Sequence, residues 1–107
     1  MIIVNAKLET NSSNISKIKS EVELIEKETL LEEGCQDYAF SVELNNPNVI
    51  RITEKWDNQK ALEAHFTTPH MIRFQSVLSD NPVDKITAFF YEAKEVSPQG
   101  LDMEAFE

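Results

Sequence analysis

The side chains best suited to chemistry in this chain of 107 residues are concentrated between Glu54 and His70. This stretch contains the only tryptophan, Trp56, and both histidines, His65 and His70. An indole ring can stack on an aromatic ligand, and an imidazole, with an ordinary pKa of about 6.5, can accept a proton near neutral pH. Side chains that can do either are otherwise scarce in this chain, so this stretch is the first candidate for a functional site.

Glu54 and Trp56 are expected to point the same way, because alternate residues of a strand lie on one face. A carboxylate on the face that also carries Ile50 and Ile52 must find a polar partner, or its pKa must rise. Glu54 could hold a helix N-terminus or a lysine, or it could act in acid–base chemistry. Trp56 is either a core residue or the wall of an aromatic pocket.

The two histidines belong to two successive short helices. If Leu62 and Phe66 face the core, His65 lies near the edge of their stripe and can point into the pocket. It is then the natural base for an acidic phenol or hydroquinone. His70 is the second residue of the next helix, where the positive helix end disfavours protonation, and a structural role is its simpler interpretation.

Other kinds of site find little support in the residue pattern. No metal site is expected, since no third ligand accompanies the two histidines and the H-E-x-x-H spacing is absent. The only glycines, Gly34 and Gly100, make no phosphate-binding loop, and no nucleophilic triad is evident. Cys35 is the only cysteine, so we interpret it as a small buried residue in a reducing compartment.

Hydrophobic periodicity predicts the elements that position these residues. Four segments alternate apolar and polar residues and are predicted strands: residues 2–9, 37–44, 49–56 and 85–94. Three segments have helical spacing: residues 15–33, 58–66 and 69–78. A turn is expected at residues 45–48, and Thr68 before Pro69 is typical of a helix start. The order predicts an α+β, ferredoxin-like βαββαβ fold with a broken second helix.

The last predicted strand carries large apolar groups on both faces, with Ile86 and Phe90 on one and Phe89 and Tyr91 on the other. Helices that cover only one face of the sheet would leave the other face exposed. We therefore expect a homodimer in which the two sheets pack against each other.

The chain is predicted to form one domain, residues 1–96, followed by a tail, residues 97–107. The tail has no strong periodicity. Its apolar residues could dock on the partner protomer: Leu101, Met103 and Phe106.

The charge balance limits the partners and the location of the protein. A net charge of −9 argues against nucleic acid, because phosphate binding needs clustered Lys and Arg, and more weakly against anionic membranes. No apolar run approaches the roughly 20 residues needed to span a bilayer. The N-terminal residues 1–4 enter a strand pattern without a basic leader, so a cytoplasmic location is expected.

Three short segments resemble the antibiotic biosynthesis monooxygenase family, in particular its small quinol-monooxygenase-like members: Glu54-Lys55-Trp56, Ala61-Leu62-x-x-His65 and Thr68-Pro69-His70. The resemblance covers residues 1–95 and implies a dimeric α/β barrel of two ferredoxin-like protomers. It implies oxidation of a quinol or other electron-rich aromatic by O2 without metal, flavin or other cofactor. It further implies His65 as the base and a substrate-binding role for four residues: Asn5, Glu54, Trp56 and His70.

The haem-degrading branch of the same superfamily uses an Asn on the first strand, a Trp in the short helix and an axial His in the next helix. This chain has Ala6, His65 and Gln75 at those places, so haem degradation is not expected. Asn5 is one residue away from the first place and faces the other side of its strand.

Two further functions stay open at this point. An isomerase of small phosphorylated carbonyl compounds would need a cationic phosphate site, and Lys55, Lys60 and Arg73 are not visibly clustered in the sequence. A non-catalytic dimeric protein that binds a small molecule is equally compatible with the fold, because one scaffold hosts many functions.

Overall fold

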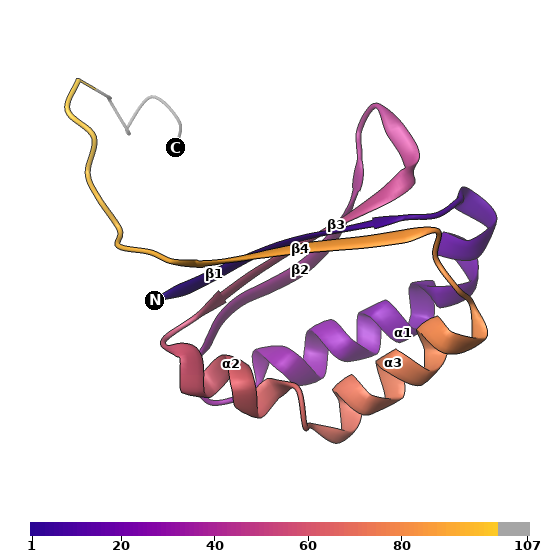
Figure 1. Ribbon diagram of the computed structural model, residues 1–107, viewed down its shortest axis with the longest axis horizontal. Coiled ribbons are helices and arrows are strands. Elements are labelled where there is room, and N and C mark those ends of the chain that lie inside the picture. Colours follow the sequence, from indigo (N-terminus) through magenta and orange to yellow (C-terminus); the bar gives the residue numbers. More distant parts are fainter. Residues whose placement is uncertain (101–107) are drawn as a thin grey trace.

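The computed structural model describes residues 1–100, in which three helices cover one face of a four-stranded antiparallel sheet (Figure 1). The elements in chain order are β1 (Ile2–Glu9), α1 (Ser12–Leu30), β2 (Cys35–Glu43), β3 (Asn46–Trp56), α2 (Gln59–His65), α3 (Pro69–Asp80) and β4 (Lys85–Glu92). The strands lie in the order β2-β3-β1-β4. This topology confirms the predicted ferredoxin-like α+β fold with its broken second helix.

Each helix begins at a polar cap. Asn11, Asn58 and Thr68 accept hydrogen bonds from backbone N–H groups in the first turns of α1, α2 and α3, respectively. Because Asn11 is the first of these caps, α1 begins at Ser12, three residues before the predicted start. The predicted start of α3 at Pro69 is confirmed.

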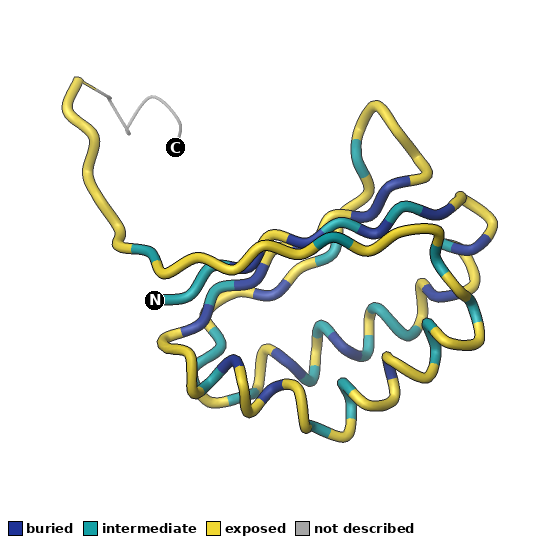
Figure 2. Tube along the Cα trace, viewed as in Figure 1, coloured by how far each residue is buried: buried dark blue, intermediate teal, exposed yellow. Residues whose placement is uncertain are grey.

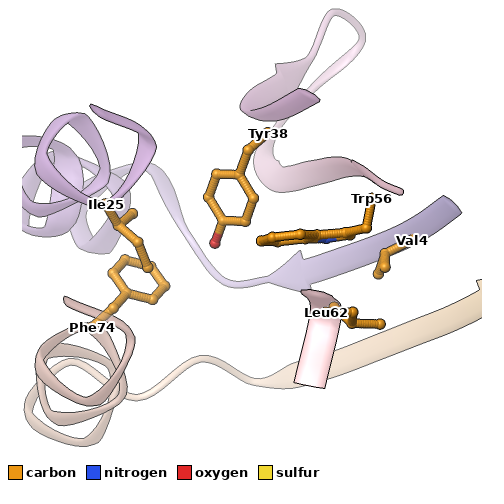
Figure 3. Packing of buried hydrophobic residues seen from close by; sticks show 6 residues of the cluster. All are labelled: Val4, Ile25, Tyr38, Trp56, Leu62 and Phe74. Carbon is orange, nitrogen blue, oxygen red and sulfur yellow. The ribbon is translucent and has the colours of Figure 1, made fainter. Parts of the chain in front are cut away.

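The core lies between the helices and the central strands, as the dark blue segments of Figure 2 show. At the α2 end of the sheet, one buried cluster takes a side chain from every element except β4 (Figure 3). Its members are Val4, Ile25, Tyr38, Trp56, Leu62 and Phe74. The alternating residues Val4, Ala6 and Leu8 are buried and form the inward face of β1.

The hairpin between β2 and β3 differs from the prediction. Glu43 pairs with Asn46, so the turn is at Leu44 and Asn45 and not over residues 45–48. Alternation along residues 37–44 puts Val42 and Leu44 on the same face as Tyr38, yet they are 47% and 99% exposed. The hairpin loop extends away from the helices (Figure 1), which leaves Leu44 uncovered, whereas Val42 lines a groove together with Ile15 of α1.

The face of the sheet opposite the helices is open in the described chain (Figure 1). Asn5 pairs with Phe89, and Ile3 with Tyr91, so all four side chains are on this face. Phe89 and Tyr91 are 57% and 51% exposed. The prediction of large apolar groups on this face of β4 is thereby confirmed.

Residues 93–100 leave the sheet as an extended segment with mostly exposed side chains (Figure 2). The predicted docking residues of the tail, Leu101, Met103 and Phe106, are outside the described residues. Within residues 1–100, no helix is long and apolar enough to cross a membrane.

Candidate functional site

His65 is the last residue of α2 and is only 1% exposed. It follows the buried Leu62 by three residues, which places both side chains on the face of α2 that packs on the sheet. Its ring lies among aromatic rings, with centroid distances of 5.0 Å to Trp56, 5.3 Å to Tyr38 and 6.0 Å to Phe66. The structure thus brings together the predicted base and the predicted tryptophan.

A carboxylate that the sequence analysis did not identify connects the two histidines. Oε2 of Glu32 lies 2.7 Å from Nδ1 of His65 and 2.7 Å from Nε2 of His70. Glu32 is in the turn between α1 and β2, 33 residues before His65. No local sequence pattern indicates so distant a contact.

Gly34 allows this turn to lie close to α2. Its φ of +83° belongs to the left-handed region, which glycine adopts without steric cost. A Cβ atom at this position would lie 2.6 Å from the Cβ of Ala61 in α2. The predicted end of the first helix near Gly34 therefore also brings the Glu32 carboxylate close to the histidines.

The hydrogen bonds indicate how the protons of His65 are arranged. An ionised carboxylate can only accept, so a neutral His65 ring carries its proton on Nδ1 and has an acceptor at Nε2. This Nε2 atom is buried and has no hydrogen-bond partner within residues 1–100. Native proteins rarely leave such an atom without a partner. A hydroxyl group of a bound molecule would satisfy it.

Glu54 finds its partner in Trp56, and not in a lysine or a helix N-terminus. The indole Nε1 donates a hydrogen bond of 3.0 Å to Oε1 of Glu54. Both residues are buried, with Glu54 9% and Trp56 0% exposed. Burial raises the pKa of Glu54 above its ordinary value; the bond from Trp56 and the nearby His65 lower it in part, and Glu32 raises it.

Replacing Glu54 with glutamine is expected to raise the melting temperature near neutral pH. The folded protein holds this proton more tightly than the unfolded chain, so the contribution of Glu54 to stability decreases as pH rises above the ordinary carboxyl range. Glutamine does not ionise, so the variant does not lose stability as pH rises. Its carbonyl oxygen can still accept the hydrogen bond from Trp56. Thermal unfolding at several pH values measures the effect.

The expected stabilisation disappears at a pH below the ordinary carboxyl range, where Glu54 is protonated in both states. Glu63→Gln is the matched control, since Glu63 is an exposed carboxylate on α2. An equal shift in both variants, or a lower melting temperature of Glu54→Gln near neutral pH, would contradict the pKa argument.

The Cys35 thiol and the Tyr38 hydroxyl are poor candidates for a reactive anion, because the pKa of each is raised. Burial, with smaller effects of Glu32 and Glu54, raises the pKa of the half-buried Cys35 thiol to about 11. A thiol with this pKa stays protonated near neutral pH and is a weak nucleophile. Burial, again with Glu54 and Glu32, also raises the pKa of Tyr38. The carboxylate–imidazole pair is therefore the better candidate for proton transfer.

The sheet separates Asn5 from Glu32 and His65. It is exposed on the open face, whereas Val4 and Ala6 on either side of it point toward the helices. Of the other two haem positions, Ala6 is buried in β1 and Gln75 is exposed on α3.

The three cations that a phosphate site would need belong to different surfaces. Arg73 on α3 donates from Nε and Nη2 to the Glu21 carboxylate, each at 2.9 Å. Lys55 pairs with Ile3 of β1 and lies on the open face, while Lys60 is exposed on α2. No feature of these residues favours the isomerase.

A cleft of about 350 Å³ lies beside His65, between α2 and the edge formed by β1 and β4. Leu62 and Phe66 of α2 and its C-terminal turn line one side, and Ile2 and Phe90 line the other. Phe66 is 42% exposed, and its ring is 6.0 Å from the His65 ring. Phe66 lines this cleft, whereas His65 does not.

Comparisons with known proteins agree with the fold and with the resemblance in sequence. The family model described as antibiotic biosynthesis monooxygenase matches residues 1–77, which include Glu32, Glu54, Trp56, His65 and His70. The chain is also 32% identical to the uncharacterised protein YjcS of Bacillus subtilis over 66 residues. This match covers 61% of the chain and 62%, less than two thirds, of that relative.

Two solved structures are similar over most of their length. A candidate antibiotic biosynthesis monooxygenase from Deinococcus radiodurans is 28% identical with a TM-score of 0.84, and the match covers 92% of this chain and 97% of that one. A conserved protein from Methanosarcina mazei Go1 is 30% identical with a TM-score of 0.80, over 87% and 92% of the two chains.

Proposed function

Because the chain belongs to the antibiotic biosynthesis monooxygenase family, we propose that it oxidises a hydroquinone or a related electron-rich phenol with O2. The observation that supports this proposal is the state of His65. Glu32 holds its Nδ1, and its buried Nε2 has no partner within residues 1–100. The buried rings of Trp56 and Tyr38 hold the imidazole in place, and the partly exposed ring of Phe66 suits an aromatic substrate.

In the proposed reaction, His65 Nε2 accepts the proton of a substrate hydroxyl group, and Glu32 stabilises the resulting imidazolium. The phenolate transfers one electron to O2, and the substrate radical and superoxide combine to form a C–O bond. Loss of water then gives a hydroxyquinone, so that hydroquinone and O2 yield hydroxyquinone and water. Substrate and O2 supply all the electrons, and the protein supplies the base, the orientation and a dry environment. This balance requires no cofactor.

The cleft beside α2 is the proposed entrance for the substrate. Its volume of about 350 Å³ is sufficient for one or two fused aromatic rings, and Phe66 and Phe90 offer faces for stacking. Because His65 does not line the cleft, the proposal requires that the partly exposed Phe66 or its neighbours move when the substrate binds. Trp56 is fully buried, so in this proposal it supports the imidazole ring, and Asn5 on the other face takes no part.

Oxygen consumption by the purified chain with a panel of chemically reduced quinones tests this function. One molecule of O2 should be consumed for each hydroxyquinone formed, and added metal or flavin should not be required. Binding of quinones without any oxygen consumption would instead support the non-catalytic binder. Failure of the whole panel to bind would contradict an aromatic substrate.

We also propose that two copies of the chain pack through their open sheet faces. Phe89→Asp is then expected to convert a dimer into a monomer, because it buries a charge in an apolar interface. Sedimentation equilibrium measures the mass of each form. Ile86→Asp is the matched control: Ile86 is on the same strand with the same 57% exposure, but on the face toward the helices. A monomeric wild type, or dissociation of the Ile86 variant alone, would contradict this arrangement.

The single cysteine, free in the described structure, suits a reducing compartment, and we propose the cytoplasm as the site of action.

A further inference from the structure

We propose that Glu32, His65 and His70 form a binding site for one divalent transition-metal cation such as Zn2+. Nδ1 of His65, Nε2 of His70 and Oε2 of Glu32 all lie within 4.8 Å of one another. Two imidazole nitrogens and a carboxylate oxygen are a donor set that suits Zn2+ and its neighbours in the first transition row. Hard cations such as Mg2+ prefer oxygen donors alone.

The donors come from three segments that the fold holds together: the turn after α1, the end of α2 and the start of α3. The close approach at Gly34 places Glu32 against α2. The hydroxyl of Thr68 donates to the backbone oxygen of His65 and accepts from the backbone N–H of Met71, which joins the two helices. The three side chains therefore converge before any cation arrives, which lowers the entropic cost of binding.

Binding requires a local rearrangement, in which the two histidine nitrogens, now within 4.8 Å of each other, move closer together. Bonds of about 2.0–2.2 Å to a central cation place donor atoms roughly 3.3 Å apart in a tetrahedral site. The two contacts of Glu32 would lengthen from 2.7 Å as the cation takes the place of the protons that they now share. Glu32 and His70 keep 12% and 15% of their side-chain surface exposed, so the site can be reached from solvent.

The local charge also favours a cation. No Lys or Arg among residues 1–100 forms an ion pair with Glu32, whose carboxylate contacts the two histidines instead. The chain as a whole carries a net charge of −9. A divalent ion would therefore be attracted, and no resident cation would have to leave.

Occupancy would have a consequence for the reaction, and this consequence alone rests on the proposed function. A neutral imidazole that binds a cation through Nδ1 carries its proton on Nε2. His65 could then not accept a proton from the substrate. Zn2+ is therefore expected to inhibit oxygen consumption.

Calorimetric titration of the tag-free, chelator-treated full chain with zinc chloride tests the site without any substrate. We expect one cation per chain, and affinity weaker by about tenfold or more in Glu32→Gln and in His70→Gln. Glu63→Gln, which changes an exposed carboxylate on α2, should bind as the wild type does. Circular dichroism verifies that each variant is folded. If one of the two ligand variants does not fold, the other still tests the site.

Magnesium chloride should give no saturable heat, and Co2+ should give visible absorption that both ligand variants lose. The absence of saturable Zn2+ binding, equal affinity in all variants, or equal weakening by Glu63→Gln would each overturn the site. If Zn2+ binds as expected but no quinol is oxidised, the metal site stands and the proposed function fails.

Discussion

Replacing His65 with glutamine is expected to lower the rate of oxygen consumption with a reduced quinone by about 10²–10⁴-fold, with a much smaller change in KM. Glutamine can still donate a hydrogen bond to Glu32, and it fills part of the space of the ring. It cannot accept a proton near neutral pH. The substitution therefore lowers kcat, which reports the chemical step, and leaves substrate binding largely unchanged. Initial rates measured with an oxygen electrode give both constants.

The control for this variant is Lys60→Gln, which changes an exposed side chain on the same helix outside the cleft and should retain the wild-type rate. Since His65 is only 1% exposed, the variant must first be shown to be folded by near-ultraviolet circular dichroism. A folded His65→Gln protein whose rate stays within about twofold of the wild type would exclude His65 as the base.

Replacing Trp56 with alanine is expected to lower the free energy of unfolding by about 3–5 kcal/mol. Trp56 is completely buried in the cluster that joins β1, β2 and the three helices, so its removal leaves a large cavity. It also leaves the carboxyl group of Glu54 buried without its N–H partner. Urea denaturation measures the loss.

Trp56→Phe keeps one aromatic ring, so it leaves a smaller cavity than alanine does, and it also removes the N–H group that binds Glu54. We expect Trp56→Phe to lower the free energy of unfolding by about 1–3 kcal/mol, which is less than the decrease expected for Trp56→Ala. Phe66→Ala, at a ring that is 42% exposed, should cost clearly less than Trp56→Ala. If Trp56→Ala cost less than about 1 kcal/mol, the packing described for this cluster would be wrong.

Periodicity was sufficient to predict most of the fold from the sequence. Alternation placed Glu54 and Trp56 on one face, where they share a hydrogen bond, and the Thr68-Pro69 pair marked the start of α3. The predicted position of the turn between β2 and β3 was wrong, because the residues of this segment tolerate several kinds of tight turn. Pairing across the hairpin, which local sequence does not encode, selects Leu44 and Asn45.

The candidate site was predictable only where its residues are close in sequence. His65 follows the apolar stripe of α2, so its inward position follows from helical geometry. Glu32 is 33 residues away in a turn, and only the packing of that turn on α2 brings it to His65 and His70. The separation of Asn5 from this group depends on which face of the sheet the helices cover, and that is a property of the tertiary fold.

Isotopically labelled O2 shows directly whether the protein inserts oxygen into an aromatic substrate. The purified chain is supplied with a reduced quinone under labelled O2, and the product is analysed by mass spectrometry. The proposed reaction predicts one labelled oxygen atom in each hydroxyquinone and the other in water, with formation of this product strongly reduced in His65→Gln. A product without label, or labelled product formed equally fast by His65→Gln, would contradict monooxygenation with His65 as the base.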